Sequence, residues 1–337
     1  MSEKRCRVKL SIVTTLYRSA STIDEFYRRA LAAAEPITRD IELVMVNDGS
    51  PDDSLARAVA LQEADPRVVV IDLSRNFGHH KALMTGLAQA SGDLVFLVDS
   101  DLEEEPELLA RFHERLAQGD CDVVYGVQEV RRGRLFERAT GELFFALVNA
   151  LGDQSLPRNV LVARLMTRAY VRALLAHEER EFLIGNLFQL AGFRQVGLQV
   201  SKLSTSSTTY SFRMRLEMAV KHLTTTSSRL LYYVMYGGIA IFMMSLLAIL
   251  YIVARYFTSG IGVSGFASLI VSIWFFGGLT ILILGIIGIY VADILIETKR
   301  RPYTVIRQIY RNDAGAKLIH VASRDQRADG QAMSGRS

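Results

Sequence analysis

Two aspartates stand one residue apart in LVFLVDSDLEEEPE, where Asp99 and Asp101 come directly after an apolar run. In an extended segment alternate side chains point to the same side, so both carboxylates can face one point. Such hard oxygen ligands suit Mg²⁺ or Mn²⁺, which usually keep waters and bind substrate phosphates. A metal there would stabilise the charge that builds on a departing diphosphate. The same spacing is common among acidic residues on protein surfaces that bind nothing. The position of this pair at a strand end is what favours a metal site.

A second apolar run, in VMVNDGSPDDS, ends in Asn47, Asp48 and Gly49. Short polar side chains at this point could read a nucleobase or ribose, and glycine permits a close approach. Ordinary turn chemistry is the equal alternative, because Asn, Asp, Gly, Ser and Pro are the usual turn residues. We also expect Ser50 to cap the helix that follows, with Pro51 in its first turn.

A third feature is SRNFGHHKAL, which places Arg75 and Lys81 where they could meet phosphate. The adjacent His79 and His80 could cap a helix or contact substrate. A metal site at these histidines is not expected, because neighbouring positions on a helix do not face one point. The alternative for the whole segment is a solvated helix start.

These features need a scaffold that brings strand ends together, and the first half of the chain predicts one. Apolar runs alternate with helical patterns, which indicates a mostly parallel sheet with helices on both faces. Ligands of such sheets bind beyond the carboxyl ends of the strands. We expect strands at Val8–Tyr17, Ile41–Asn47, Val68–Leu73, Leu94–Asp99 and Cys121–Val127. We expect helices at Thr22–Ala34, Asp52–Ala64, His79–Ala90, Pro106–Gln118, Leu135–Leu151, Arg168–Ala176 and Phe182–Ala191.

The second half contains two long uncharged stretches, Leu230–Ala254 and Ile261–Ala292. Each exceeds the roughly 20 residues that cross a bilayer. Helices buried in a soluble protein are the alternative, which two such runs in tandem disfavour. Basic residues flank both outer ends, so the positive-inside tendency places both ends in the cytoplasm.

The chain is therefore expected to divide into regions that lie in water, at the membrane interface and in lipid. We expect a cytoplasmic catalytic domain (1–200), an amphipathic interface segment (201–229), transmembrane helices (230–257 and 266–296) and a basic tail (297–337) whose end is disordered. Small residues in the second span suit close helix packing and favour self-association. These residues are Gly277, Gly278, Gly285 and Gly288.

Composition narrows the function further. The 337 residues are 50% hydrophobic and carry a net charge of +4. No basic stripe is interleaved with aromatic residues, so no nucleic-acid partner is expected. Cys6 and Cys121 have no CxxC or Cys/His pattern, which argues against a disulfide framework or a zinc site. The N-terminus lacks the apolar stretch of a signal peptide, so none is expected.

Taken in order, these motifs resemble the family 2 inverting glycosyltransferases with a GT-A fold. The resemblance is strongest to their polyprenyl-phosphate branch, which includes dolichol-phosphate mannose synthase and the bacterial undecaprenyl-phosphate sugar transferases. The stretches that carry it are IVTTLY, VNDGSPDDS, SRNFGHHKAL, GLAQASGDLVFLVDSDLEEEPE, DVVYGV and GIIGIYVADILIETKRRPYTV.

The resemblance implies transfer of a sugar from a UDP-, dTDP- or GDP-linked donor to polyprenyl (undecaprenyl) phosphate, with inversion. It implies a multi-pass protein of the bacterial inner (plasma) membrane that serves cell-envelope polysaccharide or lipopolysaccharide synthesis or modification. Asp99 and Asp101 would hold Mg²⁺ or Mn²⁺ and, with Arg164, form the catalytic set. The donor site would comprise Tyr17, Asn47, Asp48, Gly49, Arg75, Lys81 and Asp99. Transfer to another lipid or glycan, or an inactive membrane-anchored scaffold, are the alternatives.

One departure from the family concerns the general base. Where many members read Gly-Asp-Phe-Arg, this chain reads Leu161–Arg164, with Val162 in place of the aspartate proposed to be catalytic. Asp153 and Glu178 are candidate substitutes. A lipid phosphate is already anionic near neutral pH, so the site needs chiefly positioning and charge neutralisation. Candidates for binding the acceptor phosphate are Arg164, Lys202, Arg213 and Arg215, unless these are simply membrane-surface residues.

Overall fold

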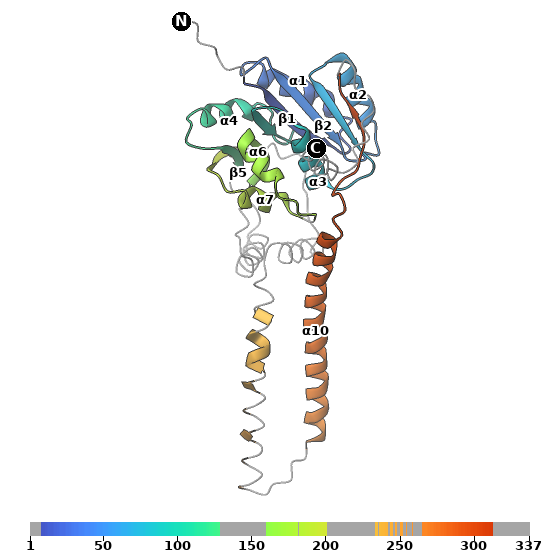
Figure 1. Cartoon of the computed structure of the whole chain (residues 1–337), viewed down its shortest axis with the longest axis vertical. Helices are drawn as coiled ribbons and strands as arrows, with labels where there is room; N and C mark the ends of the chain where they lie inside the picture. Colours follow the sequence, from blue (N-terminus) through green and yellow to red (C-terminus); the bar gives the residue numbers. More distant parts are fainter. Residues whose placement is uncertain are drawn as a thin grey trace, which may run out of the picture. The chain divides into compact units, whose positions relative to one another are not determined.

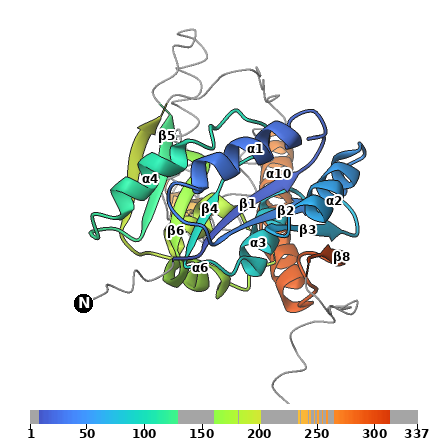
Figure 2. The same ribbon diagram turned by 90° about the horizontal axis from the view of Figure 1, so that it is seen from above.

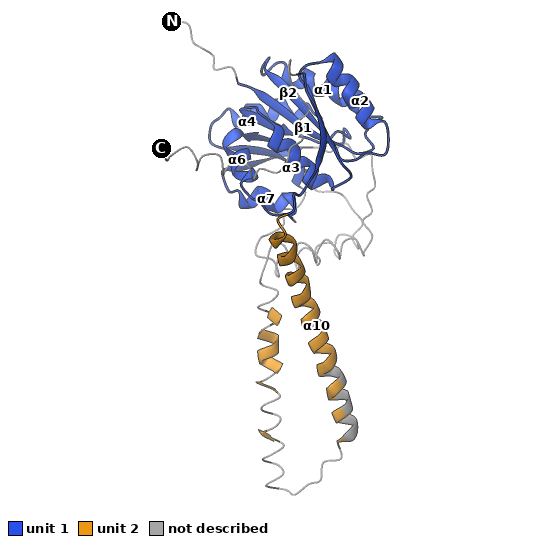
Figure 3. Cartoon of the chain, turned by 45° about the vertical axis from the view of Figure 1, so that its right-hand side comes forward, with its two compact units in different colours: residues 1–132, 157–208, 301–337 blue, residues 133–156, 209–300 orange. Residues whose placement is uncertain are grey.

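The computed structural model describes residues 8–128, 160–180, 182–200 and 265–312, together with scattered residues between 233 and 258. The chain divides into two compact units, coloured blue and orange in Figure 3. The first comprises Met1–Arg132, Pro157–Thr208 and Arg301–Ser337, and the second comprises Gly133–Leu156 and Thr209–Arg300. The predicted interface segment 201–229, the predicted helix 135–151 and the end of the tail from residue 313 lie outside the described residues.

The first unit is built on one mostly parallel sheet (Figure 1). Its described strands are β1 (Leu10–Leu16), β2 (Ile41–Asn47), β3 (Val68–Leu73), β4 (Leu94–Leu97), β5 (Val123–Gln128), β6 (Val160–Thr167), β7 (Gln195–Val200) and β8 (Ile306–Tyr310). Their order in the sheet is β7-β5-β6-β4-β1-β2-β3-β8. β1 pairs in parallel with β2 and β4, and β2 pairs in parallel with β3. β6 and β8 run antiparallel to their neighbours.

Helices cover both faces of this sheet, as Figure 2 shows from above. One face packs against α1 (Ile23–Ala34), α2 (Ser54–Ala64) and α4 (Leu108–Leu116). The other packs against α3 (His79–Gln89), α6 (Arg168–Leu175) and α7 (Ile184–Leu190). Every residue of β2 is buried, because a central parallel strand has an apolar layer on each side.

The alternating pattern of the first half is confirmed, with strands and helices close to the predicted ranges. The start of α2 differs from the prediction, because the helix begins at Ser54 after Asp53 rather than after Ser50. The reason is local: the Asp52 carboxylate accepts hydrogen bonds from the hydroxyls of Ser50 and Ser54. Those bonds form a turn that precedes the helix, and Ser50 belongs to that turn.

Three strands were not predicted, namely β6, β7 and β8. The most consequential is β8, which lies in the region assigned to the tail (297–337). It pairs antiparallel with β3 and occupies the edge of the sheet. Ser74 N donates to the carbonyl of Val305, which extends this pairing by one bond. The chain thus returns to the catalytic sheet after its apolar region.

The second unit contains α10 (Phe266–Thr298), which is 33 residues long. Among the described residues one helical stretch, Phe276–Thr298, is long and apolar enough to cross a membrane, with a mean hydropathy of 2.6. Many of its described large side chains are exposed, for example Ile281 to 72% and Ile294 to 64%. The first predicted span, 230–257, falls mostly outside the described residues, although those described from Tyr233 onward are helical. The first span and a multi-pass arrangement therefore stay predictions.

Candidate active site

Several of the predicted site residues lie together at the carboxyl ends of the central parallel strands. β1, β2 and β4 are parallel neighbours, so their carboxyl ends lie side by side. Tyr17 follows β1, Asn47 ends β2, and Asp99 lies just beyond β4. This edge is where open parallel sheets bind their ligands.

The turn after β4 is tied to its neighbour through Ser100, which lies between the two aspartates. Ser100 is buried, and its hydroxyl donates to the carbonyl of Thr15 at 2.8 Å and lies 3.1 Å from the hydroxyl oxygen of Ser19. Asp99 is partly exposed, whereas Asp101 is exposed and accepts a hydrogen bond from Glu103 N. The buried serine fixes the backbone, while the Asp101 carboxylate is exposed and the Asp99 side chain is 24% exposed.

His79, the first residue of α3, lies between β1 and Asp99. Its Nδ1 is 3.1 Å from Thr15 Oγ1, and its Nε2 is 3.5 Å from Asp99 Oδ1. With the ring proton on Nε2, the Thr15 hydroxyl donates to Nδ1 and the N–H faces the carboxylate. Carboxylates that hold metals are commonly oriented by a second shell of this kind. The geometry therefore gives His79 a role in orienting Asp99.

The loop beyond Asp101 is anchored to β6 by Glu104, whose side chain is buried. Its two carboxylate oxygens accept the backbone N–H groups of Val162 at 3.2 Å and Ala163 at 2.6 Å. Leu102, between Asp101 and this anchor, has a φ of +62°, a conformation that costs energy for a side chain larger than glycine. The surrounding contacts hold the loop in that shape.

Glu104→Gln should loosen this anchor. An amide has one acceptor oxygen, so one of the two backbone N–H groups on β6 loses its partner in a buried setting. We expect a loss of about 1–3 kcal/mol in the free energy of unfolding, measured by chemical denaturation of the full chain in detergent. Glu105→Gln, on the same loop and partly exposed, is the matched control. Equal stability of the two variants would contradict this role for Glu104.

Asp48 and Gly49 join the β2 turn to the loop before α3. The Asp48 carboxylate is 2% exposed and accepts Phe77 N at 2.7 Å and Gly78 N at 3.0 Å. Burial raises the pKa of this carboxyl, against the two N–H donors that lower it. Gly49 has a φ of +60°, and a Cβ there would lie 2.5 Å from Asn76 N. Both residues thus bring two loops into contact.

The remaining described donor-site candidates lie after β1, on the loop before α3 and in the first turn of α3. Arg75 is exposed, and its guanidinium carbon stacks 4.1 Å from the centre of the Phe77 ring. Lys81 lies in the first turn of α3. Tyr17 is 48% exposed, with the Arg18 guanidinium 5.7 Å from its ring centre. Arg75 and Tyr17 therefore present cationic and aromatic surface at the same edge.

Arg164 has a different setting from the one expected of an acceptor-phosphate ligand. It lies on β6 and is 3% exposed, and its guanidinium donates to the carbonyls of Val162 and Leu161. The group lies 3.2 Å from the centre of the Phe188 ring, and burial lowers its pKa to about 10. This placement gives Arg164 an interior role beneath the site. Lys202, Arg213, Arg215 and Asp153 lie outside the described residues, and Glu178 is exposed.

The carboxylates of Asp99 and Asp101 fit a hard divalent cation that takes its remaining ligands from water and substrate. Within the described residues no group of three His, Cys, Asp or Glu side chains could hold a metal by itself. Mg²⁺ characteristically binds through one or two carboxylates, waters and substrate phosphates. Two accessible carboxylates on a fixed turn match that pattern.

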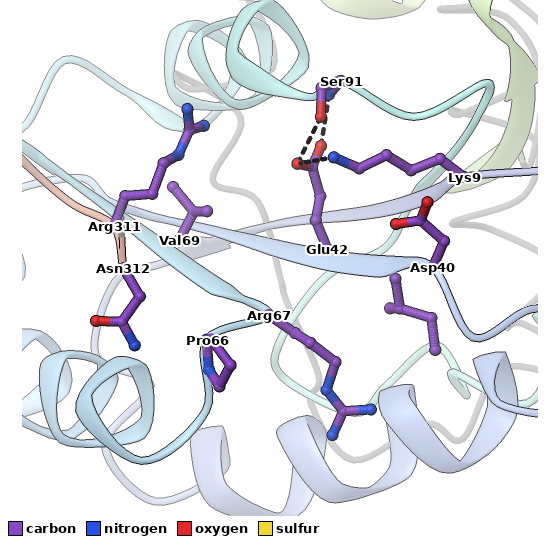
Figure 4. Close-up of a pocket in the computed structure, with 10 residues that line it drawn as sticks. Lys9, Asp40, Glu42, Pro66, Arg67, Val69, Ser91, Arg311 and Asn312 are labelled. Carbon is purple, nitrogen blue, oxygen red and sulfur yellow. Dashed lines mark hydrogen bonds and ion pairs between the residues drawn. The ribbon is translucent and has the colours of Figure 1, made fainter. Parts of the chain in front are cut away.

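A pocket of about 300 Å³ lies at the other ends of these strands (Figure 4). Ile41 begins β2, Arg67 precedes β3 and Arg311 follows β8, so the pocket is at the amino ends of the parallel strands. In it the Glu42 carboxylate meets Lys9 Nζ at 3.2 Å and the Ser91 hydroxyl at 2.7 Å. These charges compensate one another within the fold, in contrast to the carboxylates at the Asp99 edge.

Sequence reasoning did not single out Ser100, Glu104 or Asp72 as site residues. Ser100 could have been found, since it lies between the two predicted metal ligands. Glu104 and Asp72 gave no signal, because their partners are distant in sequence: Val162 for Glu104, and Arg307, 235 residues away, for Asp72.

Comparison with known proteins agrees with this geometry. A family profile described as Glycosyl transferase family 2 matches residues 11–177. A Mycobacterium tuberculosis protein assigned to the glycosyltransferases is 50% identical over 307 residues, covering 91% of this chain and 90% of that protein. The chain belongs to glycosyltransferase family 2. The sequence resemblance is thereby confirmed, and the protein is a glycosyltransferase with a GT-A-like α/β fold.

Other family 2 relatives match over nearly their whole length. The bactoprenol glucosyl transferase of Shigella phage SfII is 31% identical over 311 residues, covering 91% of this chain and 100% of that protein. The uncharacterized glycosyltransferase YkcC of Bacillus subtilis is 32% identical over 310 residues, with coverage of 90% and 94%. These matches extend well beyond the profile, because coverage of 90% or more of this chain includes α10.

Proposed function

We propose that this family 2 glycosyltransferase moves a sugar from a nucleotide-sugar to the phosphate of a polyprenyl lipid. The reaction would take place at the cytoplasmic face of the bacterial plasma membrane, in synthesis or modification of cell-envelope polysaccharide. The observation that carries the proposal is the pair of accessible carboxylates, Asp99 and Asp101, on a fixed turn at the carboxyl edge of the sheet. That edge suits a donor diphosphate with its metal.

The lipid acceptor is supported by two further observations. Relatives named bactoprenol glucosyl transferases match this chain almost end to end. The apolar helix Phe276–Thr298 has the length and hydropathy to sit in the same membrane as a polyprenyl chain. We propose that the predicted first span accompanies it, and that the glycine face of the second span permits self-association.

The proposed reaction does not need a general base, because the acceptor phosphate is already anionic. In the proposed step an oxygen of the lipid phosphate forms a bond to the anomeric carbon while the bond to the nucleotide diphosphate breaks, which inverts that carbon. A bound Mg²⁺ or Mn²⁺, held by Asp99 and Asp101, would neutralise the departing diphosphate. His79 orients Asp99, and Arg75 on the loop before α3 and Lys81 in the first turn of α3 can balance further phosphate charge.

Basic residues must also receive the acceptor phosphate. Because Arg164 is buried against Phe188, we assign this task to Lys202, Arg213 and Arg215, with Arg164 supporting β6 from inside. Tyr17, Asn47, Asp48 and Gly49 would surround the nucleoside of the donor. In this arrangement Asp48 shapes the site through the Phe77–Gly78 backbone.

Purified full-length protein in detergent tests the proposal. UDP-, dTDP- and GDP-sugars are each mixed with undecaprenyl phosphate and Mg²⁺ or Mn²⁺, and released nucleoside diphosphate and lipid-linked sugar are measured. We expect one nucleotide class to give release that requires both metal and lipid phosphate. Undecaprenol and diacylglycerol serve as control lipids. Equal transfer to diacylglycerol would overturn the acceptor assignment, and absence of release with every donor would overturn the function.

A further inference from the structure

Asp72 is a buried carboxylate close to the donor edge that the proposed reaction does not use. It is the penultimate residue of β3, and its side chain is 2% exposed. A charge removed from water in this way is costly unless it is paired and hydrogen-bonded. Asp72 has two partners: Asn47 Nδ2 donates to its Oδ1 at 2.8 Å, and Arg307 Nη1 lies 3.2 Å from its Oδ2.

The cation comes from the far end of the chain. Arg307 lies on β8, in the segment that follows α10, and its side chain is 60% exposed. Its second nitrogen, Nη2, donates to the carbonyl of Ser74 at 2.7 Å, just past the end of β3. One guanidinium therefore bridges the Asp72 carboxylate and the adjoining backbone, a geometry that lysine cannot reproduce.

The partner on the other side, Asn47, is fixed at both ends of its amide. Its Nδ2 donates to Asp72, and its Oδ1 accepts Ser50 N at 3.2 Å. This second bond closes the Asn47–Ser50 turn, which also contains Asp48 and Gly49. Arg307, Asp72 and Asn47 thus form a continuous polar chain from β8 to the donor turn.

We propose that Arg307 is a positioning residue for the donor site. It balances the buried charge of Asp72, which orients the Asn47 amide and thereby shapes the turn that meets the nucleoside. The inference rests on the proposed function, because that function assigns the Asn47–Ser50 turn to the donor. Its consequence is that the segment after the apolar helix sets donor affinity.

Binding of nucleoside diphosphate to the full chain tests this inference. Calorimetry with UDP, dTDP and GDP in the presence of Mg²⁺ first identifies the nucleotide that wild type binds. With that nucleotide, Arg307→Gln should raise Kd about tenfold, as expected for coupled neighbours. The donor KM should rise in parallel, with the lipid KM unchanged. Arg311→Gln, just beyond β8, is the matched control and should bind as wild type does.

A double variant separates positioning from plain structural support. Asp72→Asn removes the charge that Arg307 balances but keeps an acceptor for Asn47. Asp72→Asn combined with Arg307→Gln should therefore restore Kd to near the wild-type value. A merely structural arginine would lower the unfolding midpoint without this rescue. If wild type binds the nucleotide and Arg307→Gln binds it with the same Kd, the inference alone is overturned. If wild type binds none of the nucleotides, the proposed function is overturned as well.

Discussion

Asp99→Asn and Asp101→Asn should each lower the rate of sugar transfer by about 10²–10³-fold, the size of effect seen when one stabiliser of transition-state charge is removed. Each change takes away one negative oxygen ligand, so the metal concentration for half-maximal activity should also rise. The double variant should be little worse than the poorer single variant, because residues that act as a unit are not additive. Nucleoside diphosphate release in the presence of undecaprenyl phosphate is the measurement.

Folding should be preserved in these variants, since the buried Ser100 ties the turn to β1 and both aspartate side chains are accessible. Glu114→Gln, an exposed carboxylate on α4, is the control and should keep full activity. Release from Asp99→Asn or Asp101→Asn at the wild-type rate and metal requirement would remove these residues from the metal site.

Gly49→Ala should damage stability and donor binding together. The new Cβ would lie 2.5 Å from Asn76 N and 2.6 Å from Arg75 C, at a backbone φ of +60°. We expect a loss of about 2–4 kcal/mol in the free energy of unfolding, combining left-handed strain with a collision against backbone. Because the Arg75–Gly78 loop must move away, the donor KM should rise as well.

Gly119→Ala isolates the two causes. Gly119 also has a positive φ, +78°, but nothing lies within 4 Å of the position that its Cβ would take. That variant should show only the backbone cost, about 1–2 kcal/mol, and an unchanged donor KM. If the two alanine variants unfold at the same denaturant concentration, the contact of Gly49 with the neighbouring loop is not what restricts this position.

The sheet was predictable where paired strands are close in sequence and consist almost entirely of apolar residues. β1, β2 and β3 are short buried runs between helical patterns, and their order along the chain predicts parallel pairing. β6 was missed although VLVARLMT is nearly continuous apolar sequence, because it runs antiparallel to its neighbours and lies outside the regular strand–helix alternation of the first half. Burial of Arg164 against Phe188 is a tertiary property, and a single sequence carries no mark of it.

The candidate site could be located from the sequence to the level of its strand ends. Asp99 and Asp101 could be proposed as metal ligands because their spacing and their position after a strand are local features of the sequence. The contacts that hold the neighbouring loops were not predictable, since Glu104 binds the backbone of β6 and Asp72, which orients Asn47, binds an arginine 235 residues later. Contacts of this range depend on how the chain folds back, and IRQIY is too short a segment to predict its own pairing with β3.

The pairing of β8 with β3 also bears on how the catalytic sheet stays soluble. An uncovered edge strand presents a row of unpaired N–H and C=O groups, which recruits strands from other molecules. β3 is buried along its whole length and is apolar except for Asp72, so without β8 it would be a favourable template for such addition. A fragment that ends before α10 would lack β8, together with the guanidinium that compensates Asp72. We therefore expect β8 to reduce aggregation, because it replaces the largely apolar β3 at the edge of the sheet by a strand that carries Arg307 and Gln308.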